Sequence, residues 1–67
     1  MLIIPEEARL FLEKYLPKYK EYKTRRELLI ELYYLIEREG FAHSGGFYNS
    51  FGRKAQEIYD MIYEANQ

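Results

Sequence analysis

Few side chains in this sequence have the types and spacing that catalysis needs. Two carboxylate pairs lie one helical turn apart, Glu27 with Glu31 and Glu57 with Asp60, and such pairs can act as acid and base or bind a metal. A catalytic histidine needs a nucleophile or an orienting carboxylate near it, and no pattern in the sequence assigns such partners to His43, the only histidine. We therefore expect no enzyme, no metal site and no cofactor, and expect the carboxylates to pair with basic side chains on neighbouring turns.

A basic stretch supports a different chemistry, the binding of phosphates. Six basic residues and a single acid lie between residues 14 and 26, and three tyrosines alternate with them. Basic side chains contact phosphates and exposed rings stack on bases, which is what a nucleic-acid surface needs. The phosphate-binding residues of this hypothesis are Lys18, Lys20, Lys23, Arg25 and Arg26, with Arg53 and Lys54 as a second anchor at a helix N-terminus.

Two observations weigh against that hypothesis. Tyr15 and Tyr19 have the spacing of core rings. In that case the lysines around them form only the solvated outer face of a helix. The net charge of −1 is also unlike the strongly basic balance of a typical DNA-binding domain. The role of the basic stretch stays open at this point.

A segment of small residues precedes Arg53 and Lys54 and could form an anion site at a helix N-terminus. The spacing from Gly46 to Gly52, followed by Arg-Lys-Ala, does not match a P-loop, and no predicted strand comes before it. We interpret the glycines as loop geometry. The roles of His43 and of the Gly45-Gly46 pair are left open.

The aromatic residues are the strongest indication of function. Eight tyrosines and four phenylalanines in 67 residues are more rings than a domain of this size can bury. Neighbouring tyrosines on one helix point about 100° apart and cannot enter the same core, and tyrosine is enriched at protein interfaces. We predict a contact surface, extended by an exposed Leu2-Ile3-Ile4 arm, that is formed by Tyr33, Tyr34, Tyr48, Tyr59 and Tyr63.

Three helices must position these residues. The first is predicted over residues 5–16, because apolar residues recur at helical spacing after Pro5 and Pro17 disfavours helical geometry at Leu16. A short helical piece or ordered connector follows over 17–23. Thr24-Arg25-Arg26-Glu27 fits a capping box and begins a helix over 25–39, which is apolar around most of its circumference and therefore central. Gly40 is expected to end it in a left-handed conformation.

The third helix is predicted over residues 50–65, capped by Asn49 or Ser50. It carries a narrow apolar seam, and Gly52 should weaken its first turn slightly. The residues from 41 to 49 are too many for a tight turn, so we expect an ordered aromatic, glycine-containing loop. The predicted fold is all-α, a small three-helix bundle forming a single helical domain over residues 1–67.

Composition narrows the function classes further. With no cysteine, the chain cannot add a disulfide to a marginal core, which leaves well-packed helices or self-association. No apolar run is long enough for a membrane span or a signal peptide, so we expect a cytoplasmic protein without membrane contact. The predicted function is a non-enzymatic protein–protein interaction module, a small regulator, adaptor or inhibitor that binds another protein or a second copy of itself. The alternative is a nucleic-acid-binding regulator that uses the 14–26 stretch.

Overall fold

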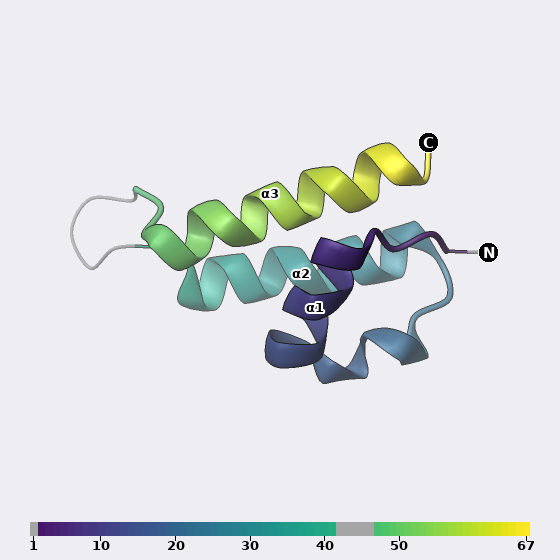
Figure 1. Cartoon of the computed structure of the whole chain (residues 1–67). Helices are drawn as coiled ribbons and strands as arrows, with labels where there is room; N and C mark the ends of the chain where they lie inside the picture. The colour runs from purple at the N-terminus through teal and green to yellow at the C-terminus, as the bar shows by residue number, and fades with distance from the viewer. Residues whose placement is uncertain (1, 42–46) are drawn as a thin grey trace.

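The computed structural model describes residues 2–41 and 47–67, and within them the chain forms three α-helices and one 3₁₀ helix. In order these are α1 (Glu6–Tyr15), η1 (Pro17–Glu21), α2 (Arg25–Glu39) and α3 (Ser50–Ala65). The predicted all-α three-helix bundle is confirmed, and no predicted helix end is more than one residue away from the observed one. Figure 1 shows α2 and α3 as a long antiparallel pair, with α1 crossing them and η1 leading into α2.

The core is built from the apolar stripes that the sequence predicts. α2 contributes the most side chains, as expected for the central helix, and α1, η1 and α3 pack theirs against it. The prediction that Tyr59 flanks the α3 seam is confirmed, since its ring is half-buried at the edge of the core. The buried apolar residues are Ala8, Phe11, Leu12, Tyr19, Leu28, Leu29, Leu32, Leu35, Ile36, Ala55, Ile58 and Ile62.

The predicted break at Pro17 is confirmed. Leu16 leaves helical geometry with φ −144° and ψ 64°, and Pro17 begins the 3₁₀ helix. Its fixed φ and missing N–H are compatible with a new helical start but not with the interior of α1. The turn sends Tyr19 back into the core, where its hydroxyl donates to Glu13 Oε2 at 3.0 Å.

The cap of α2 confirms half of the predicted capping box. Thr24 Oγ1 accepts a hydrogen bond from the backbone N–H of Glu27 at 3.2 Å. The Glu27 carboxylate, however, accepts from the Thr24 hydroxyl at 3.2 Å, so here it orients the capping hydroxyl.

The prediction of a left-handed Gly40 was wrong, because this glycine has φ −96° and ψ 0°. Its lack of a side chain serves a close approach between the end of α2 and the start of α3. A Cβ on Gly52 would lie 2.0 Å from the carbonyl oxygen of Gly40, and a Cβ on Gly40 would lie 3.0 Å from the Cα of Gly52. Gly52 is therefore a packing residue, and its cost in helix propensity is secondary.

Asn49 fastens this contact. Its side-chain Oδ1 caps α3 by accepting from Gly52 N at 2.7 Å, and its backbone N–H donates to the Gly40 oxygen at 2.9 Å. Its Nδ2 also donates to the carbonyl of Glu39 at 2.9 Å. One residue thus satisfies groups at the end of α2 and at the start of α3.

The N-terminal arm is tied down, which corrects the expectation that it is exposed. Leu2 and Ile4 are half-buried against the core, and only Ile3 is exposed. Asn66 accepts from Ile3 N at 2.7 Å and donates to Ile3 O at 2.6 Å. This pair of hydrogen bonds holds the two ends of the chain together, and Figure 1 shows both ends on the same side of the molecule.

None of the helices in residues 2–41 and 47–67 has both the length and the apolar character needed to cross a membrane.

Candidate functional site

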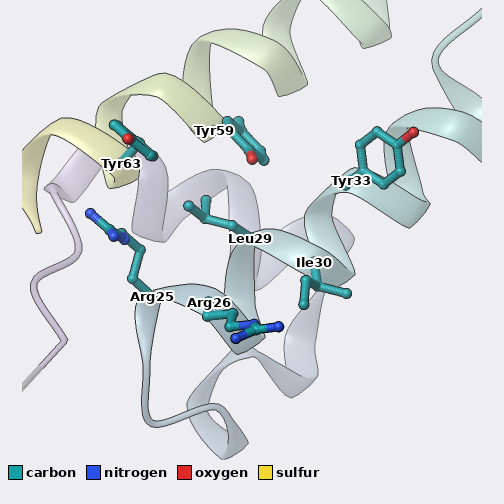
Figure 2. A pocket seen from close by; sticks show the side chains of 7 residues that line it. All are labelled: Arg25, Arg26, Leu29, Ile30, Tyr33, Tyr59 and Tyr63. Atoms are coloured by element: carbon teal, nitrogen blue, oxygen red, sulfur yellow. The ribbon is translucent and has the colours of Figure 1, made fainter.

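A groove of about 440 Å³ runs along the surface between α2 and α3 (Figure 2). It is lined by residues from both predicted binding surfaces. Three of the tyrosines predicted to bind a protein lie beside two of the arginines predicted to bind phosphate. Its lining is Arg25, Arg26, Leu29, Ile30, Tyr33, Tyr59 and Tyr63. We call it the α2–α3 groove.

Three of the α2 residues that line the groove form one helical stripe. Arg26, Ile30 and Tyr33 follow at intervals of four and three residues, which places them on one side of the helix. Ile30 is 41% exposed and Tyr33 is 51% exposed, whereas Leu29 beneath them is buried. One turn further, a hydrogen bond to the Glu37 carboxylate raises the pKa of the Tyr33 phenol. This side therefore offers an apolar centre with a cation at one end and an anion at the other.

The α3 side is made by Tyr59 and Tyr63, which lie one turn apart, with Tyr59 half-buried and Tyr63 45% exposed. The Arg25 guanidinium lies 4.8 Å from the centroid of the Tyr63 ring and donates to the carbonyl of Asn66 at 3.2 Å. Figure 2 shows Arg25 reaching toward the Tyr63 ring, whereas Arg26 stays on the α2 side. Arg25 is thus held by the protein, and Arg26 is the more accessible cation of the two.

The other two predicted tyrosines are exposed but lie outside the groove. Tyr34 is 54% exposed and its ring lies 6.1 Å from that of Tyr33, as expected for adjacent residues on one helix. Tyr48 stacks on Phe41 at 5.1 Å and donates to Gln56 Oε1 at 3.2 Å. An isolated antiparallel bridge joins Phe41 and Tyr48, so the described ends of the predicted aromatic loop are ordered against each other.

The predicted phosphate-binding residues do not gather on one surface. Lys18 and Lys20 lie on η1, whereas Arg53 and Lys54 lie at the start of α3, at the opposite end of the α2–α3 pair from Arg25 (Figure 1). Arg53 and Lys23 are exposed, but Lys54 forms ion pairs with Glu7 and with Glu57, the latter at 3.7 Å. These two carboxylates compete with any phosphate for Lys54.

The rings of the basic stretch mostly serve the fold. Tyr19 is buried, and the half-buried Tyr22 donates its hydroxyl to Glu31 Oε1 at 3.1 Å. In both tyrosines burial is the main cause that raises the pKa of the phenol. Tyr15 is 41% exposed and packs on Phe11 and Phe51. The expectation of Tyr15 as a core ring was therefore wrong, and that of Tyr19 is confirmed.

The carboxylate pairs have ordinary partners. Glu57 pairs with Lys54 as predicted, but Asp60 accepts from the uncharged Gln56 amide at 3.1 Å, and Glu31 accepts from a tyrosine. Across residues 2–41 and 47–67, no three Asp, Glu or His side chains cluster as metal ligands would.

Sequence reasoning missed a second hollow, of about 560 Å³, between α1 and α3. Phe11 and Phe51 lie in it with ring centroids 5.7 Å apart, and Leu10 stands 58% exposed at its edge. Lys14 and Lys54 flank it. Leu10 lies off the apolar stripe of α1, and this departure from the pattern is the signal that could have found it.

The chain matches no protein-family model, and neither a curated protein nor a solved structure matches it. The predictions about His43, Gly45 and Gly46 fall outside the described residues.

Proposed function

We propose that this protein is a non-enzymatic interaction module that binds a protein partner through the α2–α3 groove. The observation that carries the proposal is the exposed apolar surface of Ile30, Tyr33 and Tyr63 above the buried Leu29. Exposed apolar side chains that line one groove of a small domain favour an interaction site. Tyrosine and arginine, the residue types that surround it, supply most of the binding energy in many interfaces.

The chemistry of the groove indicates the kind of segment it would accept. Two antiparallel helices leave between them a channel that suits the apolar side of a third helix. Arg26 is exposed at one end and Glu37 at the other. The incoming segment should therefore place an acidic side chain beside Arg26 and a basic side chain beside Glu37. Opposite charges at the two ends would set its direction.

The test is a binding comparison among three versions of the protein: the wild type, Tyr33→Ala and Tyr34→Ala. The two tyrosines are neighbours on α2 and similarly exposed, but only Tyr33 lines the groove. Each would serve as bait in a lysate of the native host, and any protein retained would be purified and titrated against all three. A partner that binds the wild type and Tyr34→Ala equally, and Tyr33→Ala at least about tenfold more weakly, supports the groove. Equal binding to all three contradicts it.

The nucleic-acid alternative rests on the exposed side chains of Lys18, Lys20, Lys23 and Arg26. It predicts retention of duplex or single-stranded DNA that weakens steeply between two salt concentrations. No retention at low salt would remove it, and retention abolished by charge reversal at Arg26 with the groove tyrosines intact would favour it over the protein-binding function.

A further inference from the structure

The charges on one exposed stripe of α2 are arranged so that the stripe is complementary to an antiparallel copy of itself. It consists of Arg26, Ile30, Tyr33 and Glu37, spaced by four, three and four residues, and all four side chains are exposed. Because the intervals are the same in both directions, the midpoint between Ile30 and Tyr33 is also the midpoint between Arg26 and Glu37. The stripe is about 16 Å long at 1.5 Å per residue.

Two such stripes placed antiparallel about a two-fold axis through this midpoint fit each other. Arg26 of one copy then faces Glu37 of the second copy, and Ile30 faces Tyr33, so each contact occurs twice. A parallel arrangement would instead place Arg26 against Arg26 and Glu37 against Glu37. Opposite charges at the ends of an apolar centre specify direction in paired helices, as the flanking charges of coiled coils do.

The groove provides the space for this pairing. The partner's Ile30 and Tyr33 would enter it above Leu29, with Tyr59 and Tyr63 as the far wall. None of the groove residues belongs to α1 or η1, because α1 packs on another part of α3 and η1 packs on α1. The contact would also add apolar burial to a cysteine-free domain of 67 residues, whose own core is small.

From this complementarity, and on the basis of the proposed function of the groove, we infer that its occupant is a second copy of this chain, bound with α2 antiparallel to α2. The four helices α2 and α3 of the two copies then form the centre of the dimer. Arg26 and Glu37 act as the pair that fixes its direction and register.

The test uses two charge reversals, Arg26→Glu and Glu37→Arg, and measures the dimer dissociation constant by sedimentation equilibrium. The wild type should dimerise. Each variant alone places like charges opposite each other at both ends, so its dimer should weaken at least about tenfold. An equimolar mixture of the two variants restores opposite charges at both ends and should dimerise like the wild type. The double variant Arg26→Glu/Glu37→Arg should do the same.

The matched control is Arg38→Glu, which makes the same charge change on the same helix away from the stripe. It should leave dimerisation unchanged, and far-UV circular dichroism would verify that every variant is folded. A wild type that stays monomeric up to about 1 mM overturns the inference. So does a dimer that neither reversal weakens, or one that the mixture fails to restore, since the copies would then meet through another face.

These outcomes separate the inference from the proposed function. A monomeric wild type that captures a different protein in a Tyr33-dependent way keeps the groove as a binding site and discards the second copy as its occupant. A dimer that resists Tyr33→Ala, together with no Tyr33-dependent partner, contradicts both.

Discussion

Gly52→Ala gives the sharpest test of how the fold is held together. The added Cβ would lie 2.0 Å from the carbonyl oxygen of Gly40 and 2.8 Å from its carbonyl carbon. These are backbone atoms, and the Gly40 oxygen is also fixed by the N–H of Asn49 at 2.9 Å. No side-chain rotation can relieve the clash, so the end of α2 must move away from the start of α3.

The magnitude follows from two opposing effects. Overpacking a well-packed contact typically costs about 1–3 kcal/mol, and a clash with fixed backbone belongs at the upper end. Alanine is the better helix former by about 1 kcal/mol, which offsets part of this cost. The expected net loss is about 2 kcal/mol in the free energy of unfolding. For a domain of this size that corresponds to a fall of about 8 to 16 °C in Tm.

The assay is thermal and urea unfolding of the purified protein, followed by far-UV circular dichroism. Arg53→Ala, an exposed change at the next position, is the control and should alter stability by less than about 0.5 kcal/mol. Helix propensity alone predicts that Gly52→Ala is stabilising, so the sign of the change decides between the two accounts. A variant as stable as the wild type, or more stable, would refute the close contact of the two glycines.

Three further changes test other parts of the fold. Asn66→Ala removes both hydrogen bonds to Ile3 and should lower the free energy of unfolding by about 1–2 kcal/mol in thermal denaturation. Thr24→Ala removes the α2 cap and should cost about 1 kcal/mol in urea unfolding. Hydrogen bonds from Tyr19 and Arg9 hold the pKa of Glu13 below its ordinary value of 4.5. Its stabilising contribution is therefore complete above that value and lost as the pH falls through the lower folded pKa, so Glu13→Gln should lessen the acid sensitivity of Tm.

Local chemistry made most of the fold predictable. The end of α1 follows from the ring of Pro17, the start of α2 from the hydroxyl of Thr24, and the start of α3 from the side chain of Asn49, each acting on backbone groups within a few residues. The exposure of both Tyr33 and Tyr34 follows from helix geometry, because adjacent side chains cannot share one core.

Contacts between distant segments could not be predicted in this way. The role of Gly40 depends on the distance between the end of α2 and the start of α3, and the spacing of residues in the sequence does not determine that distance. The sequence gives Lys54 only Glu57 as an acidic partner, and the crossing of α1 places Glu7 beside it as well. The groove could not be predicted because its two walls belong to different helices. Arg26 lies on α2 and Tyr63 on α3, and only the packing of these helices brings them to the same groove.

The amide of Asn66 has a consequence for how the molecule opens. Its Nδ2 donates hydrogen bonds both to the carbonyl of Ile3 and to the carbonyl of Ile62 within α3. The first residues and the last turn of α3 are therefore linked through one side chain. Fraying at either end removes cover from Leu2 and Ile4, which rest on the core. The two ends should therefore behave as one cooperative unit, with the amide hydrogens of both exchanging with the same free energy of opening.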